Sequence, residues 1–398
     1  MLIFLHRYSN RVVFNCVVLI LFLISTWACK KVAIRPPPNA MRSDTTINNW
    51  TQSGGGPERA NLRSFAVNPP LQNVWIYKAS SAVSSTMLAV DGVLYFTTLD
   101  GRFEVLDIAS GKRLGRGKCE GQREAAIAYR KRYLFFASRY GDNTLTKYDL
   151  FYGKYMWKID AGDIASEPLV TDDAVYVSAQ YNHIDKFEFN GGQKIWTFKT
   201  EDQQRSSPAL KDNVLVVGCD DGVIYALNSD NGKLKWKVET GASVFATPIL
   251  AGARAFIGSI DRTFYALNLA DGSMAWTFSA KTPIYQTAAS DGRRVLFGAS
   301  DGQFYCLNAE SGAELWRFRA NSAISTSPLI VDKVVYFGSL DRNYYCLDLE
   351  SGAQLWSFET KGRIRTSPIV WQNYVLGASE DRFVYAFAPS DSTTNHSL

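Results

Sequence analysis

The sequence is short of the residues on which much hydrolytic and zinc chemistry depends. Only 3 of its 398 residues are histidines. A zinc site built on several histidines, or a Ser/His/Asp triad, therefore has almost nothing to draw on. Carboxylates and thiols also bind metals, so this scarcity alone does not exclude every metal site. The net charge is +5, from 43 basic and 38 acidic residues, which is too small to indicate nucleic-acid binding.

Cysteine is also sparse and follows no recognised motif. The 6 cysteines include neither a C-x-x-C sequence nor an adjacent pair, so no redox or zinc motif is indicated. Cys306 and Cys346 occupy one position of an internal repeat, where other copies have Ala226, Ala266 and Ala386. We therefore interpret both cysteines as small buried residues rather than as a disulfide pair.

The one marked apolar run, residues 12–24, is short for a transmembrane helix, which needs roughly 20 apolar residues. Arg7 and Arg11 precede this run, and the small residue Ala28 follows it. A basic start, a short apolar core and a small residue before the cut predict a secretory signal over residues 1–28. The signal would be removed from the mature protein.

The end of this segment resembles a bacterial lipoprotein signal at Ala28-Cys29. The resemblance implies that Cys29 becomes the lipidated first residue and anchors the protein to the outer membrane. Thr26 and Trp27 stand where lipoprotein signals usually have leucine and a small residue. A plain signal or an uncleaved anchor therefore stays open as an alternative.

Aromatic residues are abundant, and the tryptophans recur with a nearly fixed period of 40 residues. The series has eight positions, and Gly115 occupies the one that lacks a tryptophan. An acidic turn residue stands fifteen residues before most of these positions, and a glycine stands four residues before them. The seven tryptophans of the series are Trp75, Trp157, Trp196, Trp236, Trp276, Trp316 and Trp356.

Each repeat contains four short apolar or alternating runs separated by turn residues such as Asp221-Gly222, which suit tight hairpins. Four strands in about 40 residues predict one blade of a β-propeller. The chain is therefore predicted to be all-β, an eight-bladed propeller with four-stranded blades and a tryptophan between neighbouring blades. Pro208 and Pro248 fit the first, innermost strand of their blades, where a missing N–H costs little.

The two ends of the repeat predict how the ring closes. The last repeat has only three strands after the Trp356 run, and one extra strand around Trp75 precedes the first repeat. Pairing these ends completes the last blade and leaves no open edge. The predicted organisation is a signal (1–28), a flexible Pro- and Gly-containing tether or linker (29–70), the propeller (71–389) and a C-terminal tail (390–398).

Units such as CLNAESGAELW, which ends at Trp316, resemble the pyrroloquinoline-quinone-like propeller repeat, and the resemblance extends over residues 71–389. That family includes quinone-dependent alcohol and glucose dehydrogenases and the BamB lipoproteins, non-catalytic factors of outer-membrane protein assembly. A signal, an anchor, a short linker and a single ring most resemble the BamB group. The resemblance implies a monomeric periplasmic scaffold, without cofactor, that binds a barrel-assembly partner and no nucleic acid.

Two other functions stay open at this point. A quinone-dependent oxidoreductase of this family would carry an adjacent cysteine pair, a calcium site, an aspartate base and long insertions. The sequence has no adjacent cysteines and only short loops, and its repeated aspartates suit hairpin turns. The remaining alternative is a binding or sensor propeller of another envelope complex.

Between the repeats lies a variable position, in the bend before the Ser/Thr-Pro element of each blade. These bends are expected to meet at one mouth of the channel, where loops on a rigid ring commonly carry binding residues. Arginine, phenylalanine and tyrosine are enriched at protein interfaces. The variable position reads Ser84, Glu124, Ala165, Arg205, Phe245, Tyr285, Ser325 and Arg365. The predicted partner-binding residues are Gln204, Arg205, Phe245, Tyr285, Ile364 and Arg365.

Residues 101–140 hold an excess of basic side chains, ten against four acidic ones. Such a surface could meet lipid headgroups, a cell-wall polymer or an acidic protein. An ordinary solvated β-surface explains it slightly better, because the basic residues are spread over both strand faces.

Overall fold

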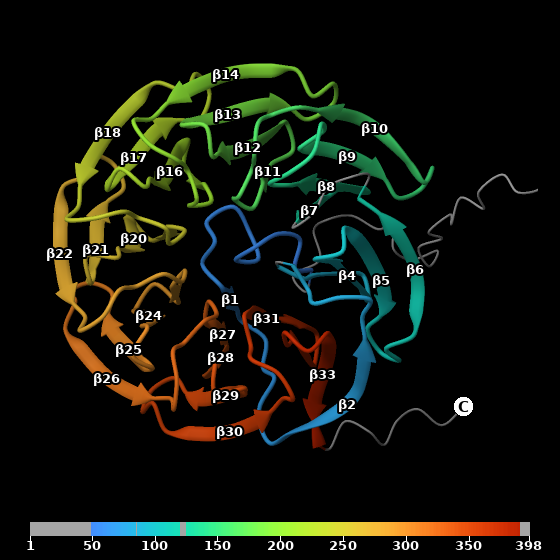
Figure 1. The fold of residues 1–398 in the computed structure, drawn as a ribbon. Helices are drawn as coiled ribbons and strands as arrows, with labels where there is room; N and C mark the ends of the chain where they lie inside the picture. The colour runs from blue at the N-terminus through green and yellow to red at the C-terminus, as the bar shows by residue number, and fades with distance from the viewer. Residues whose placement is uncertain (1–48, 85, 120–124, 391–398) are drawn as a thin grey trace, which may run out of the picture. The chain divides into compact units, whose positions relative to one another are not determined.

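The described part of the chain forms a ring of eight β-sheets. The computed structural model describes residues 49–84, 86–119 and 125–390, whose sheets surround a central axis (Figure 1). Seven sheets have four strands, and one has five because the short strand β1 (Leu62–Arg63) joins it. The predicted eight-bladed β-propeller is confirmed. The predicted signal and Cys29 lie outside the described residues, none of which forms a helix able to cross a membrane.

Each blade runs from an innermost to an outermost strand in chain order, except that β2 (Leu71–Lys78) is the outermost strand of blade 8. Blades 1 to 4 comprise β3 (Leu88–Val90), β4 (Val93–Thr98), β5 (Arg102–Asp107) and β6 (Arg113–Lys118); β7 (Ala126–Arg130), β8 (Tyr133–Ala137), β9 (Leu145–Asp149) and β10 (Lys154–Ile159); β11 (Leu169–Val170), β12 (Ala174–Ala179), β13 (His183–Glu188) and β14 (Lys194–Lys199); and β15 (Ala209–Lys211), β16 (Val214–Gly218), β17 (Val223–Asn228) and β18 (Leu234–Glu239). Blades 5 to 8 comprise β19 (Ile249–Ala251), β20 (Arg254–Gly258), β21 (Thr263–Asn268) and β22 (Met274–Ser279); β23 (Ala289–Ser290), β24 (Arg294–Gly298), β25 (Gln303–Asn308) and β26 (Glu314–Arg319); β27 (Leu329–Val331), β28 (Val334–Gly338), β29 (Asn343–Asp348) and β30 (Gln354–Glu359); and β31 (Thr366–Trp371), β32 (Tyr374–Ala378) and β33 (Phe383–Pro389).

The repeated aspartates fix the hairpins between the second and third strands. In blade 4, Asp221 accepts the backbone N–H of Val223 at 2.8 Å and the hydroxyl of Tyr225 at 2.7 Å. Asp261 and Asp341 accept the equivalent bonds in blades 5 and 7. The aspartate therefore shapes its own turn and holds the tyrosine that packs between blades.

The repeated tryptophans join each blade to the next. The indole N–H of Trp276 donates to the carbonyl of Ala309 at 3.0 Å, and its ring lies against Gly312. A Cβ built on Gly312 would lie 2.6 Å from that ring, and the glycine has φ +73°. Both facts explain why glycine stands there. The bond to the residue 33 positions later is also made by Trp75, Trp196, Trp236 and Trp316, and Trp157 makes the equivalent bond to Phe189, 32 positions later.

Blades 1 and 2 meet without a repeat tryptophan, because Gly115 stands at that position in β6. The ring of Phe103 fills the interface instead. Its centroid lies 5.3 Å from that of Phe136 and 5.7 Å from that of Tyr148, both in blade 2. An aromatic cluster therefore replaces the indole contact between these two blades.

The ring closes through β2, as predicted. β2 pairs antiparallel with β33, with Leu71 opposite Pro389 and Lys78 opposite Phe383. The indole of Trp356 then donates to the Leu71 carbonyl at 2.9 Å. The junction of the two ends thus repeats the contact made between other blades, and no strand edge is left open there.

The segment before β2 lies inside the ring. Trp50 and Arg59 are 1% and 0% exposed, respectively. Seven innermost strands donate one equivalent backbone N–H each to this segment. The donor–acceptor pairs are Ala89 to Trp50 O, Tyr129 to Thr51 O, Val170 to Gln52 Oε1, Leu210 to Pro57 O, Leu250 to Glu58 O, Ser290 to Ala60 O and Ile330 to Asn61 O.

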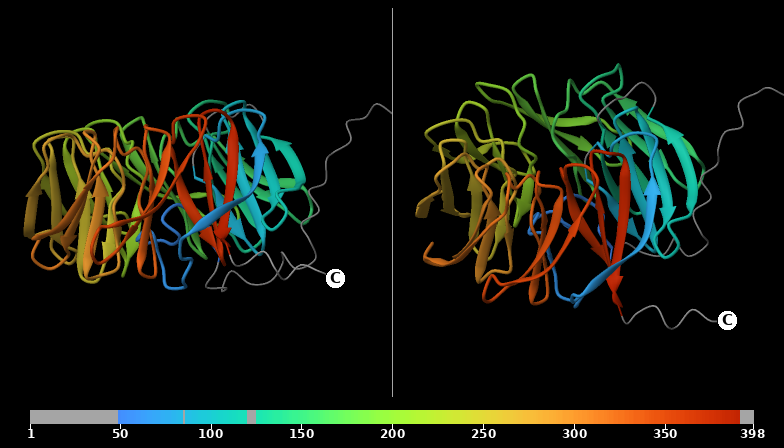
Figure 2. Two further views of the ribbon diagram at one scale, coloured as in Figure 1. Left: turned by 90° about the horizontal axis from the view of Figure 1, so that it is seen from below. Right: turned by 60° about the horizontal axis from the view of Figure 1, so that its bottom comes forward.

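For residues 49–70 the structure thus differs from the predicted flexible linker, whose first part lies outside the described residues. Innermost strands present an edge of backbone groups that need partners, and this segment supplies them. Asn49 bonds to Asp91 in the β3–β4 turn, and Trp50 runs antiparallel to Ala89. The segment therefore enters from the face bearing the β3–β4 turn, here named the entry face. In the side views it projects from the lower edge of the ring, where β33 also ends (Figure 2).

Candidate functional site

The opposite face, which carries the loops between blades, opens into a pocket on the axis and is named here the mouth. The pocket has a volume of about 360 Å³, within the range typical of small binding sites. Its rim includes Ala165, Phe245, Tyr285 and Arg365, from the predicted variable bends, and Arg139 from the β8–β9 loop. The structure therefore brings several of the variable positions together around one opening.

A ring of mostly short polar side chains forms the pocket wall just below the rim. Most of these residues stand two positions before an innermost strand, often directly before proline, whereas Ala126 and Ser367 lie within β7 and β31. Backbone N–H groups of Glu167 and Ser327 donate to the hydroxyls of Ser207 and Ser367 at 2.8 and 3.0 Å, each in the next blade. The spacing of 40 residues between these Ser/Thr positions is visible in the sequence, but their place in a pocket wall was not predicted. The wall positions are Thr86, Ala126, Glu167, Ser207, Thr247, Thr287, Ser327 and Ser367.

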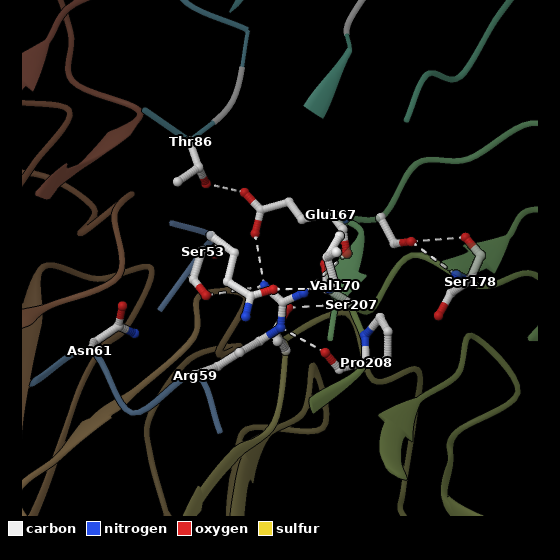
Figure 3. Close-up of polar contacts among 12 residues, drawn as sticks. Ser53, Arg59, Asn61, Thr86, Glu167, Val170, Ser178, Ser207 and Pro208 are labelled. Carbon is white, nitrogen blue, oxygen red and sulfur yellow. Dashed lines mark hydrogen bonds and ion pairs between the residues drawn. The ribbon is translucent and has the colours of Figure 1, made fainter. Parts of the chain in front are cut away.

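The N-terminal segment forms the floor of the pocket, and Arg59 holds it there (Figure 3). The Arg59 guanidinium donates to the carbonyls of Pro208 at 2.6 Å and Glu167 at 3.0 Å, and more weakly to that of Ser53 at 3.4 Å. It also forms an ion pair with the Glu167 carboxylate at 3.4 Å, and that carboxylate accepts the hydroxyl of Thr86. Burial lowers the pKa of Arg59 to about 10, against the opposing charge of Glu167, so the group is cationic at neutral pH.

Two of the predicted contact residues are aromatic groups at the mouth, the half-buried Phe245 and the exposed Tyr285. The rings of Phe245 and Tyr285 stack with centroids 6.1 Å apart, and Tyr285 is 46% exposed. The Arg205 guanidinium lies 4.8 Å from the centre of the Phe245 ring. Arg365 is exposed and paired with Glu380. These four side chains are placed where a partner could reach them.

The prediction that Gln204 and Ile364 are exposed to a partner at the rim is wrong, because both side chains are fully buried. Ile364 packs against Gly338 of the preceding blade, where a Cβ would come 2.4 Å from the isoleucine. Gln204 occupies the equivalent position in its own repeat and donates to the hydroxyl of Thr200 at 2.9 Å. The position varies in sequence but serves packing between blades, so it is not available to a partner.

At the edge of the mouth, Asp220 faces Arg205 at 3.0 Å. Burial raises the pKa of Asp220 to about 6, with Arg205 opposing the shift and Asp202 and Asp221 adding to it. A carboxyl with a raised folded-state pKa destabilises the fold when ionised. The cost is absent below the unfolded pKa and complete above the folded pKa.

We therefore expect Asp220→Asn to be more stable than the wild type at pH 8. The expected gain is about 1–2 kcal/mol, after allowing for solvent screening at the rim. The gain should fade as the pH is lowered from 6 to 4, as measured by denaturant unfolding at each pH. Glu201→Gln, at an exposed carboxylate nearby, is the control. A gain at pH 8 that persists at pH 4 would contradict the assignment.

The residues at the mouth do not fit a quinone with calcium. The four cysteines within the described ranges, Cys119, Cys219, Cys306 and Cys346, are buried and unbonded to one another, so none forms an adjacent pair. Within those same ranges no group of three or more His, Cys, Asp or Glu could hold a metal ion. Glu167, in the pocket wall, is already paired with Arg59. The channel below it contains the chain's own N-terminal segment rather than a chamber.

Together the repeat and the ring define a class of protein, the propellers built from pyrroloquinoline-quinone-like repeats. The model of one family, described as outer membrane protein assembly factor BamB, matches residues 104–205, 182–288 and 279–391. These overlapping segments span more than half of the sequence, and the chain belongs to this family. No curated protein sequence matches the chain.

Solved structures with the same fold include both BamB and dehydrogenases. BamB from Moraxella catarrhalis is 17% identical with a TM-score of 0.69, covering 80% of this chain and 99% of that one. A quinohemoprotein alcohol dehydrogenase from Pseudomonas putida is 13% identical with a TM-score of 0.75, covering 90% and 83%. The computationally designed Ika8 protein is 18% identical with a TM-score of 0.71, covering 78% and 97%. At these identities the likeness shows the fold and does not separate the two functions.

Proposed function

We propose that the protein is a non-enzymatic scaffold of the bacterial envelope, similar to BamB, that holds a protein partner of outer-membrane protein assembly at its mouth. The observation that carries the proposal is the stacked pair of the half-buried Phe245 and the exposed Tyr285, beside a channel that holds the N-terminal segment through Arg59. A ring with aromatic and arginine side chains at its rim suits a protein surface.

The partner would rest on the rim rather than enter the channel. Phe245, Tyr285 and Arg205 form one connected surface in the loops before blades 4 to 6. Aromatic and arginine side chains contribute most to binding when they lie at the centre of an interface. Arg365 lies across the mouth and adds a charge at the opposite rim.

The alternative is a quinone-dependent oxidoreductase, which the likeness to dehydrogenase structures favours. Against it stand the absence of a cysteine pair from the sequence and the pairing of Glu167 with Arg59. A binding or sensor propeller of another envelope complex is a further alternative. The proposed location is the periplasm, with lipidated Cys29 anchoring the chain to the outer membrane.

The experiment compares the wild type with Phe245→Ser/Tyr285→Ser in affinity purification from envelope membranes. We expect the double substitution to reduce recovery of barrel-assembly proteins about tenfold, because it removes the aromatic centre of the surface. Thermal stability should change little. The matched control is Tyr181→Ser, which removes an exposed tyrosine (66% exposed) outside the pocket lining.

Two results would contradict the proposal. One is equal recovery of barrel-assembly proteins by the double variant and the wild type, or their absence from both. The other is dye-linked alcohol oxidation after addition of pyrroloquinoline quinone and calcium, which would favour the oxidoreductase alternative.

A further inference from the structure

The hairpin between β9 and β10 in blade 2 carries two exposed aromatic side chains at its tip. Phe151 and Tyr152 are 52% and 59% exposed, and their rings lie 4.9 Å apart. The other six hairpins between third and fourth strands have small or polar residues at these two tip positions. They are Ala109-Ser110, Asn190-Gly191, Asp230-Asn231, Ala270-Asp271, Glu310-Ser311 and Glu350-Ser351.

The turn itself does not require aromatic residues. Asp149 accepts the backbone N–H groups of Phe151 and Tyr152 at 2.8 and 3.1 Å. Asp348 in blade 7 accepts the N–H groups of Glu350 and Ser351 in the same way, at 3.1 and 2.8 Å. The same turn forms without aromatic residues at its tip. Neither burial nor the turn conformation therefore explains why Phe151 and Tyr152 are aromatic.

Basic side chains surround this aromatic tip. The Arg132 guanidinium lies 5.4 Å and the Lys154 ammonium 5.5 Å from the centre of the Tyr152 ring. Arg130, at the end of β7, and Lys131, in the β7–β8 turn, form ion pairs with Asp172 of blade 3. Two acidic groups face the four cations, the buried Asp149 and the exposed Asp172. The tip is therefore aromatic and carries a net positive charge.

The aromatic tip lies on the entry face. In blade 2, Arg130 is opposite Tyr133, and Tyr133 is opposite Asp149, so the β7–β8 and β9–β10 turns lie at one end of the blade. Successive residues of the N-terminal segment bond to equivalent positions of β3 and β7, which places this end beside the β3–β4 turn. Asn49 enters the ring at that turn, in the neighbouring blade.

We propose that the blade-2 tip, defined as Arg130, Lys131, Arg132, Phe151, Tyr152 and Lys154, contacts the surface of an anionic phospholipid membrane. Aromatic side chains with a polar edge favour the interface between headgroups and acyl chains, and neighbouring cations bind anionic headgroups. Asn49, the first described residue, lies on the same face. The proposed anchor at Cys29 would therefore hold this face, rather than the mouth, towards the membrane. The inference rests on the proposed anchor for its orientation but not for its chemistry.

The test is sedimentation of the chain from residue 29 onward, with Cys29→Ser so that no lipid can be attached, with vesicles. One set contains phosphatidylglycerol in phosphatidylcholine, and the other contains phosphatidylcholine alone. We expect binding to the anionic vesicles, weakened at high salt, and about tenfold weaker binding for Phe151→Glu/Tyr152→Ser. That variant reproduces the Glu-Ser tip of blades 6 and 7, so the turn should be preserved.

The matched control is the same aromatic pair placed in blade 1, Ala109→Phe/Ser110→Tyr, made in the Phe151→Glu/Tyr152→Ser background. Because the adjacent β3–β4 turn there reads Asp91-Gly92 instead of Lys131-Arg132, we expect it not to restore binding. Restored binding would show that any exposed aromatic pair suffices and would overturn the proposal. So would equal vesicle binding by wild type and variant, or self-association that the variant abolishes. None of these results bears on partner capture at the mouth, which is measured separately.

Discussion

Gly312→Ala is expected to destabilise the propeller by about 3–4 kcal/mol. About 1 kcal/mol or more comes from the positive φ of +73°, which an L side chain adopts at a cost. The remainder comes from overlap with the Trp276 ring, which would lie 2.6 Å from the new Cβ. Trp276 cannot withdraw without losing its hydrogen bond to Ala309 across the blade interface. Denaturant unfolding followed by tryptophan fluorescence measures the effect.

Gly252→Ala is the matched control for this prediction. Gly252 also has a positive φ, +58°, but no atom lies within 4 Å of a Cβ built on it. The control should lose only about 1 kcal/mol, the cost of the backbone conformation. Equal losses at the two positions would show that contact with the tryptophan does not explain why glycine stands at Gly312.

Arg59→Met is expected to destabilise the fold by about 3–5 kcal/mol. The substitution leaves the Glu167 carboxylate without its cation and removes the donors to the Glu167 and Pro208 carbonyls. Breaking a buried ion pair by removing one partner is strongly destabilising, whereas removing both is often close to neutral. The double variant Arg59→Met/Glu167→Gln should therefore recover part of the loss, as measured by denaturant unfolding.

Arg342→Met serves as the control for Arg59. Arg342 pairs with Glu359 at 2.5 Å, but both side chains are more than half exposed. Exposed ion pairs contribute little, so we expect a change below about 1 kcal/mol. If Arg59→Met were as mild as this control, the N-terminal segment would not be held by Arg59. Increased proteolysis of residues 49–70 in the Arg59→Met variant would independently report release of the segment.

The repeat predicted the blades and their closure because it encodes contacts between adjacent units. Trp276, Ala309 and Gly312 lie within 36 residues of one another, and the same spacing serves blade after blade. The pairing of β2 with β33 followed from counting strands, since a ring cannot leave one blade incomplete. Phe245 and Tyr285 could be placed at the mouth for the same reason.

The same reasoning misplaced Gln204 and Ile364, because variation within a repeat does not distinguish exposure from packing. The residue type at this repeat position varies, but Ile364 and its three preceding apolar counterparts each pack against a glycine of the preceding blade. A closer comparison of residue type could have signalled this, since the counterparts Val244, Ile284 and Ile324 are apolar. Arg365, the next residue, points outward and was placed correctly at the rim.

The sequence by itself determined the number of blades, their turns and their closure, because each depends on contacts within one repeat or between neighbours. Only the tertiary structure decided what fills the channel. Arg59 reaches Glu167 and Pro208 across 108 and 149 residues, and no periodic pattern encodes such contacts. A polar segment with Pro and Gly is compatible with a free linker. It became part of the core because the ring presents seven inner strands whose backbone groups it can satisfy.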